Sequence, residues 1–125
     1  MAHILIAEDE RDIRELIKFT LTFAGHQITE AANGEEAVEK AKEVIPDLIM
    51  TDVRMPKMTG YQACKAIKEN ESTAHIPVVI LSAKGQDEEK EQGIEAGADE
   101  YITKPFETEQ LIKRVAEILA SLGVS

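Results

Sequence analysis

The chain is poor in cysteine and in aromatic residues. It has one cysteine, Cys64, no tryptophan, and only 4% aromatic residues among its 125 positions. A single cysteine excludes an internal disulfide and any CxxC metal or redox motif, and it is typical of a reducing compartment. The expected location is therefore the cytoplasm. The three histidines, His3, His26 and His75, are scattered singly, which argues against a zinc site.

Positive charge is also scarce. Fourteen Lys and Arg residues face 24 Asp and Glu residues, which leaves a net charge of −10. Binding to nucleic-acid phosphates or to anionic lipid depends on neutralisation by Lys and Arg, so we expect no direct nucleic-acid binding. The sequence has no apolar run near the ~20 residues that a membrane-spanning helix needs. Its amino terminus does not read as a signal peptide, so no membrane association is expected.

The remaining composition is that of one ordinary globular domain. Apolar residues make up 43% of the chain and charged residues 30%, and the length is close to the commonest domain size. No internal repeat, low-complexity segment or Gly/Ser-rich linker divides the sequence. We therefore expect one domain over residues 1–125, with one principal site.

Short apolar runs alternate with amphipathic stretches, and this alternation predicts an α/β fold whose β-α units feed a mostly parallel sheet. The predicted strands cover residues 4–7, 27–31, 47–52, 76–81 and 101–102. Five helices are predicted after them, and their inward-facing residues at helical spacing include Leu16, Val44 and Leu122. The fourth helix, over residues 86–96, offers only Ile94 and Ala96 as apolar residues, so it is expected to be weakly anchored.

Reactive side chains gather where four of the predicted strands end. An open parallel sheet carries its site at the carboxyl ends of its strands. There the sequence has Glu8 and Asp9, then Asp52, Ser82 and Lys104. If the first and third strands are neighbours, three carboxylates converge, and a cation relieves their repulsion. Oxygen ligands without His or Cys favour a hard ion, and a partly hydrated Mg²⁺ fits few carboxylates plus waters.

These residue types together suit acceptance of a phosphoryl group. A carboxylate near a divalent cation, a hydroxyl and a lysine supplies a nucleophile, a metal clamp, a hydrogen-bond donor and a counter-charge. Asp52 is the expected nucleophile, and Lys104 would offset charge on the phosphoryl oxygens. Contacts that form only when phosphate is present can bias a two-state element, so the pattern predicts a phosphorylation switch.

Four motifs, in order along essentially the whole chain, resemble the receiver domain of bacterial two-component response regulators. They span residues 4–10, 47–60, 77–83 and 97–106. The resemblance implies a doubly wound, flavodoxin-like sheet in strand order 2-1-3-4-5 with five helices. It also implies Mg²⁺ held by Asp9, Asp52 and the backbone carbonyl of Arg54, with Glu8 acting through water. Glu8 stands where Asp is commoner, which lengthens that arm by one methylene and keeps its charge.

The same resemblance implies a phosphorylation cycle and a switch. A sensor histidine kinase or a phosphotransfer protein would phosphorylate Asp52. Ser82 and Lys104 would contact the phosphoryl group, and Tyr101 would change rotamer as Ser82 moves. The chain is then expected to be a regulator that assists only its own phosphorylation and dephosphorylation, not an enzyme.

The resemblance also implies which face of the domain passes the signal on. Phosphorylation would switch the face made by the fourth helix, the fifth strand and the fifth helix, which in many receivers meets a downstream effector, an output domain or a second copy. Lys90, Glu100 and Arg114 match positions that form intersubunit ion pairs in one DNA-binding subfamily, whereas Gln110 replaces an acid expected there. A phosphorylation-dependent homodimer through this face is one expected outcome.

Three alternative functions are open to the same pattern. A phosphatase of the haloacid dehalogenase type also uses a strand-end Asp with Mg²⁺, but it needs a second acid where this chain has Arg54. A flavodoxin-like FMN carrier needs phosphate donors after the first strand, where the acids within residues 8–12 would repel phosphate. A phosphate-independent interaction domain is disfavoured because no site residue is missing.

Overall fold

Five parallel strands form one sheet in the order β2-β1-β3-β4-β5. The computed structural model describes residues 2–83, 97–104 and 107–123. The strands are β1 (His3–Ala7), β2 (Gln27–Ala31), β3 (Leu48–Asp52), β4 (Val78–Ala83) and β5 (Glu100–Lys104). The parallel sheet and its predicted strand order are therefore confirmed.

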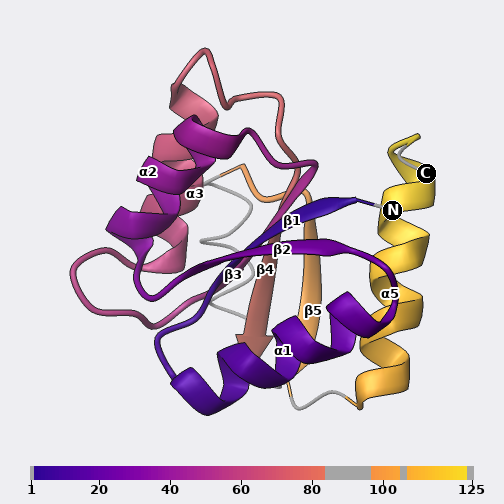
Figure 1. Ribbon diagram of the computed structural model, residues 1–125. Helices are drawn as coiled ribbons and strands as arrows, with labels where there is room; N and C mark the ends of the chain where they lie inside the picture. The colour runs from indigo at the N-terminus through magenta and orange to yellow at the C-terminus, as the bar shows by residue number, and fades with distance from the viewer. Residues whose placement is uncertain (1, 84–96, 105–106, 124–125) are drawn as a thin grey trace.

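Helices cover both faces of the sheet. Those within the described residues are α1 (Arg11–Phe23), α2 (Gly34–Val44), α3 (Gly60–Glu69) and α5 (Thr108–Ser121). α1 and α5 pack on one face, and α2 and α3 pack on the other (Figure 1). The further helix predicted over residues 86–96 lies outside the described residues. No helix in the described ranges has both the length and the apolar character needed to cross a bilayer.

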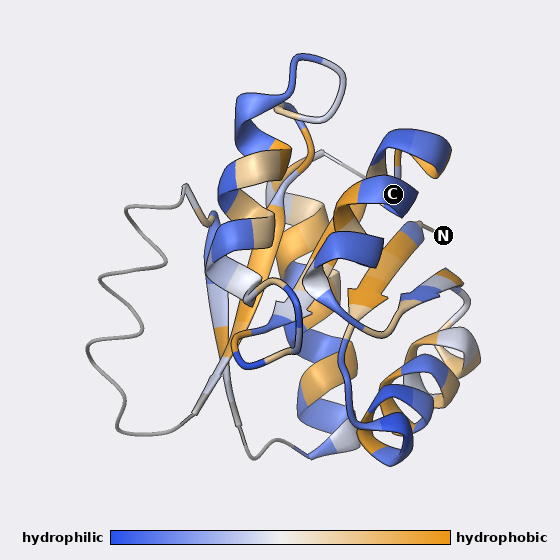
Figure 2. Cartoon of the chain, turned by 90° about the vertical axis from the view of Figure 1, so that its left-hand side faces the viewer, coloured by the Kyte–Doolittle hydropathy of each residue, from blue (hydrophilic) through white to orange (hydrophobic). Residues whose placement is uncertain are grey.

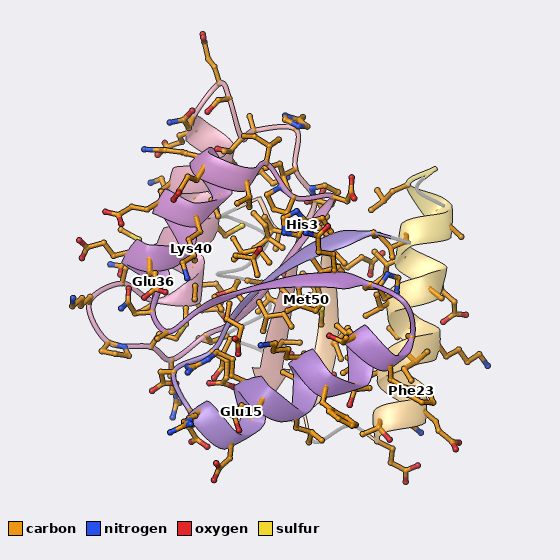
Figure 3. All side chains as sticks on the ribbon, viewed as in Figure 1. His3, Glu15, Phe23, Glu36, Lys40 and Met50 are labelled. Carbon is orange, nitrogen blue, oxygen red and sulfur yellow. The ribbon has the colours of Figure 1, made fainter. Side chains whose placement is uncertain are left out.

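The strands supply two hydrophobic cores because successive side chains point to opposite faces of a sheet. In β1, Ile4 and Ile6 pack with α1 and α5, whereas Leu5 packs with α2 and α3. Met50 of β3 joins the first core (Figure 3). Figure 2 shows apolar strands between helices whose outer turns are largely polar. β4 lies between β3 and β5 with Val78, Val79, Ile80 and Leu81 fully buried, as its sequence predicts for an interior strand.

Side-chain caps fix the starts of two helices. The Asn33 side chain accepts a hydrogen bond from the Glu36 backbone N–H at 2.8 Å and begins α2. α3 begins with a capping box, in which Thr59 and Gln62 each accept a hydrogen bond from the other's backbone N–H. The second cap ends the loop that follows β3, so it helps to fix that loop near the carboxyl edge of the sheet.

Three residues predicted to point inward are partly exposed. Leu16, Val44 and Leu122 are 49%, 37% and 43% exposed. Val44 is the last residue of α2 and Leu122 is the C-cap of α5, so both lie where the helix leaves the core. Leu16 lies instead on a flank of α1 that also carries Phe19 and Phe23, because residues three or four positions apart lie on the same side of a helix.

That flank forms one wall of a groove. Phe19 is 75% exposed and Phe23 is 83% exposed, and Phe23 lies on the outer side of α1 near α5 (Figure 3). The groove, which we call the α1–α5 groove, has a volume of about 460 Å³. Its lining residues are Leu16, Phe19, Thr20, Phe23, Thr108, Glu109 and Ile112.

Candidate functional site

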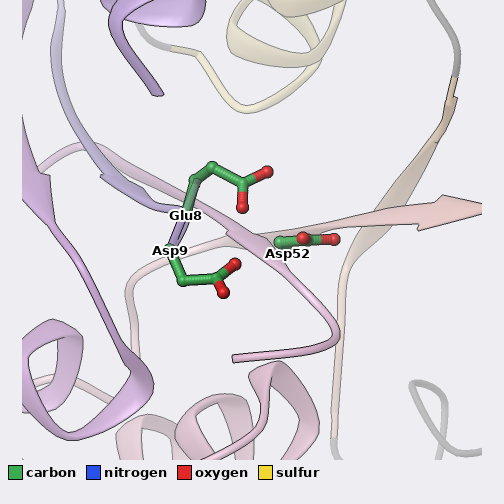
Figure 4. Close-up of side chains that lie close together, drawn as sticks. All are labelled: Glu8, Asp9 and Asp52. Atoms are coloured by element: carbon green, nitrogen blue, oxygen red, sulfur yellow. The ribbon is translucent and has the colours of Figure 1, made fainter. Parts of the chain in front are cut away.

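Three carboxylates meet at the carboxyl edge of the sheet. Glu8 and Asp9 follow β1, and Asp52 ends β3. One carboxylate oxygen of each residue lies within 4.8 Å of those of the other two (Figure 4). Ala7 of β1 pairs with Thr51 of β3, so the two neighbouring strands leave the sheet at the same level. The convergence expected from the sequence is therefore observed.

The three acids differ in exposure. Glu8 is fully buried, Asp52 is 8% exposed, and Asp9 is exposed. Burial strengthens the repulsion between carboxylates because little water screens them, and a shared cation relieves it. In octahedral Mg²⁺ coordination, neighbouring ligand oxygens lie about 3 Å apart and opposite ones about 4 Å apart. The donor set is all oxygen, so the cluster fits a small hard cation after modest side-chain rotation.

Backbone contacts fix Asp52 and the loop that follows it. The Val53 N–H donates a hydrogen bond to Asp52 Oδ1 at 2.9 Å and so orients the carboxylate. The Gly60 N–H donates to the Val53 carbonyl oxygen at 2.8 Å. A Cβ on Gly34 of α2 would lie 2.2 Å from the Met58 carbonyl oxygen, so only glycine fits where α2 meets the loop. The loop is therefore held between β3 and α2.

The next two strands bring further predicted site residues to the same edge. Asp52 pairs with Leu81, so Ser82 is the next residue along β4, and it is buried at 2% exposure. Lys104 ends β5, and its backbone pairs with Ala83. Ser82 thus lies one residue beyond the pairing partner of Asp52, and Lys104, placed by its backbone alone, lies one residue beyond the pairing partner of Ser82.

The remaining predicted residues flank this edge. Tyr101 is half-buried and packs against the core between the sheet and α2 and α3. Burial, and to a lesser degree the nearby Cys64, raises the pKa of the Tyr101 phenol, so it is neutral at pH 7. Burial also raises the pKa of Cys64 to about 11, which is typical of a core residue without thiolate character. Arg54 is exposed, two residues beyond Asp52.

The sequence reasoning did not find Arg14. Its Nη1 donates a hydrogen bond to the Glu8 carbonyl oxygen at 2.8 Å. Its Nε lies 3.5 Å from Oε1 of Glu30, near the end of β2. The only signal in the sequence is an arginine in the first turns after the acid pair, and a solvated surface arginine would look the same.

Comparison with known proteins identifies this arrangement. The family model of the response regulator receiver domain matches residues 4–116. The chain belongs to the response regulator receiver domain family. This receiver domain is 40% identical over 119 residues to RpaA, a DNA-binding dual master transcriptional regulator of Synechocystis, and the match covers 95% of this chain and 49% of RpaA.

Solved receiver structures agree with the fold. A response regulator from Chloroflexus aurantiacus matches with a TM-score of 0.89 and 37% identity, covering 95% of this chain and 98% of that one. The receiver domain of the sensor histidine kinase PA1611 from Pseudomonas aeruginosa matches with a TM-score of 0.85 and 30% identity, covering 94% and 95%. The chain spans about half the length of the curated regulators it matches. The resemblance seen in the sequence is confirmed, and the phosphatase and flavin-carrier alternatives are not favoured.

Proposed function

We propose that this receiver domain accepts a phosphoryl group on Asp52 and thereby switches a signalling output. The observation that carries the proposal is the convergence of Glu8, Asp9 and Asp52 within 4.8 Å. Such a cluster is costly unless a cation or proton compensates it, and a cation beside a strand-end carboxylate is what phosphoryl acceptance needs. Ser82 is buried and lies on the neighbouring strand β4, one residue beyond the pairing partner of Asp52, which adds support.

The metal in this proposal is Mg²⁺. Asp9, Asp52 and the backbone carbonyl of Arg54 would bind it directly, and the buried Glu8 would act through water. The solved receiver domain of PA1611 has a magnesium ion coordinated in its active-site cleft. When bound, Mg²⁺ supplies positive charge to the phosphoryl oxygens.

The chain's own residues would carry the transfer. One carboxylate oxygen of Asp52 forms a bond to phosphorus while the bond from phosphorus to the donor histidine nitrogen breaks, and that imidazole takes up a proton. The Val53 N–H keeps Asp52 oriented. Ser82 would donate a hydrogen bond to a phosphoryl oxygen, and Lys104 would offset charge there. Tyr101 would then change rotamer as Ser82 moves.

The donor would be a sensor histidine kinase or a phosphotransfer protein, docked on the α1–α5 groove. The groove is an exposed apolar surface, which is typical of protein interfaces. α1 begins two residues after Asp9, and α5 begins four residues after Lys104, so both helices start at the edge that carries the acids. A partner that covers the groove therefore reaches toward Asp52.

The output face would be formed by the predicted fourth helix, which lies outside the described residues, together with β5 and α5. Arg114 Nη2 lies 2.7 Å from Glu100 Oε1, an ion pair within the chain. A phosphorylation-dependent dimer that uses these residues, or a downstream effector or output domain, would exchange this pair for an intermolecular one. Lys90 lies outside the described residues. Charge reversal at both Lys90 and Arg114 is expected to abolish such a dimer, and a dimer that persists in light scattering would contradict this interface.

Intact-protein mass spectrometry tests the phosphoacceptor directly. The protein is incubated with acetyl phosphate, with and without Mg²⁺, as wild type, Asp52→Asn and Asp47→Asn. We expect a Mg²⁺-dependent adduct of one phosphoryl group in the wild type and in Asp47→Asn, and none in Asp52→Asn. Asp47 is the matched control because it is an exposed acid at the opposite end of β3. Failure of the wild type to form the adduct would rule out the proposed function.

A further inference from the structure

The backbone of Glu8 is held on both sides. Its N–H donates a hydrogen bond to the Ala31 carbonyl oxygen of β2 at 3.1 Å. Its carbonyl oxygen accepts from Arg14 Nη1 of α1 at 2.8 Å. The Glu8 side chain in turn accepts a hydrogen bond from the Glu10 N–H through Oε2 at 3.2 Å. The backbone that carries the buried carboxylate is thus tied to β2 and to α1.

Arg14 is itself anchored. Its Nε lies 3.5 Å from Glu30 Oε1, and its side chain is only 18% exposed. Lys18 contacts the other oxygen of the same carboxylate, with Nζ 3.2 Å from Glu30 Oε2. Arg14 reaches the Glu8 carbonyl and the Glu30 carboxylate through two different nitrogens, Nη1 and Nε, whereas a lysine would have to reach both from a single Nζ.

Arg14 has two opposite effects on a cation at the acid cluster. Its positive charge lies one hydrogen bond from the Glu8 backbone and disfavours a second cation nearby. Its hydrogen bond fixes the peptide between Glu8 and Asp9, whose two carboxylates must point at the same ion. Removal of Arg14 therefore strengthens cation binding if charge dominates and weakens it if positioning dominates.

We propose that Arg14 is a positioning residue for the cation site, holding the Glu8–Asp9 turn so that both carboxylates converge with Asp52. The inference rests on the proposed function, because it concerns the same cluster. A hydrogen bond that orients the group carrying a metal ligand commonly changes metal affinity by about tenfold or more. We take positioning to outweigh charge because Glu30, which Arg14 shares with Lys18, offsets part of the charge of Arg14.

Isothermal titration calorimetry with MgCl₂ tests this inference on four proteins: wild type, Arg14→Met, Arg14→Lys and Lys18→Met. Lys18→Met is the matched control, because Lys18 carries the same charge and pairs with the same Glu30. We expect the Kd for Mg²⁺ to rise about tenfold in Arg14→Met. In Lys18→Met it should stay the same or fall slightly. Arg14→Lys should be intermediate, because lysine keeps the charge but must reach both acceptors from one Nζ instead of two separate nitrogens.

A second readout separates positioning from general destabilisation. In the Mg²⁺-free protein, the NMR amide signals of Asp9 and Glu10 should shift in Arg14→Met and not in Lys18→Met. A Kd in Arg14→Met at or below the wild-type value overturns the inference and leaves the proposed function intact. If Arg14→Met does not fold, a wild-type Kd in Arg14→Lys overturns it instead. A wild type that binds no Mg²⁺ overturns the proposed function, and this inference with it.

Discussion

Gly60 lies so close to Asp52 that a Cβ on Gly60 would stand 2.0 Å from the Asp52 carbonyl oxygen. The two backbone segments cannot easily separate. The Gly60 N–H donates a hydrogen bond to the Val53 carbonyl oxygen, and Asp52 is paired with Leu81 of β4. The glycine that starts α3 is therefore needed for a close approach to the proposed phosphoacceptor, not for an unusual backbone angle.

Gly60→Ala should damage both stability and phosphorylation. The added methyl group must push the loop away from β3, at a cost of about 2 to 3 kcal/mol of unfolding free energy. Urea denaturation measures that loss, and acetyl phosphate labelling should fall with it. Gly25→Ala is the comparison, since Gly25 has open space around it but a φ of +99°. It should cost about 1 kcal/mol through backbone strain and leave labelling unchanged. Equal labelling in the two variants would contradict this account of Gly60.

Lys57→Gly should stabilise the protein. Lys57 has a φ of 68°, in the left-handed region that disfavours a side chain, and it is exposed. Glycine relieves the backbone strain but is more flexible in the unfolded chain, which leaves a net gain of about 0.5 kcal/mol. Comparison of urea midpoints tests this, with the exposed Lys42→Gly inside α2 expected to destabilise instead. A lower midpoint for Lys57→Gly would show that its side chain makes a compensating contact.

The position of the strand-end residues could be predicted from the sequence, because the carboxyl ends of all strands in a parallel α/β sheet lie at the same edge. Apolar runs located β1, β3 and β4, and the polar residues at their carboxyl ends had to emerge at one edge of the sheet. The strand predicted over residues 76–81 begins two residues before β4. Ile76 and Pro77 continue the apolar run of the strand but come before Val78, where β4 begins. The cluster of Glu8, Asp9 and Asp52 was therefore accessible from pattern alone.

The contacts around the site could not be predicted in the same way. The hydrogen bond from Arg14 to Glu8 joins a side chain to a backbone oxygen six residues earlier, and no periodicity reports it. The prediction that Leu16 faces inward was wrong, because an apolar residue at helical spacing can either widen the buried stripe of a helix or begin a second apolar stripe. Phe19 and Phe23 carried the missing signal, since two phenylalanines outside the stripe of Ile17 and Leu21 indicate a second apolar flank.

Phe19→Ser and Phe23→Ser should separate protein donors from small ones. If the α1–α5 groove docks the donor, each variant should lower kcat/KM for transfer from a phosphorylated histidine phosphotransfer protein by about tenfold. Labelling by acetyl phosphate should not change, because that donor needs no docking surface. Leu122→Ser is the matched control, an exposed apolar residue after the end of α5 and outside the groove. A uniform loss with both donors would point to damage to the fold instead.

His26 should make the protein less stable in mild acid. Its Nδ1 accepts a hydrogen bond from the Ala2 N–H at 3.2 Å, which requires the neutral ring. Burial, and next the positive charge of the amino terminus, lowers the pKa of His26 below the ordinary 6.5. Between the folded-state pKa and 6.5 the unfolded chain therefore binds more protons than the folded one, so stability falls as pH falls through this window. His26→Asn should flatten the dependence of the unfolding free energy on pH there, as urea titrations from pH 7.5 to 5 would measure. Equal slopes in the two proteins would exclude His26 as the titrating group.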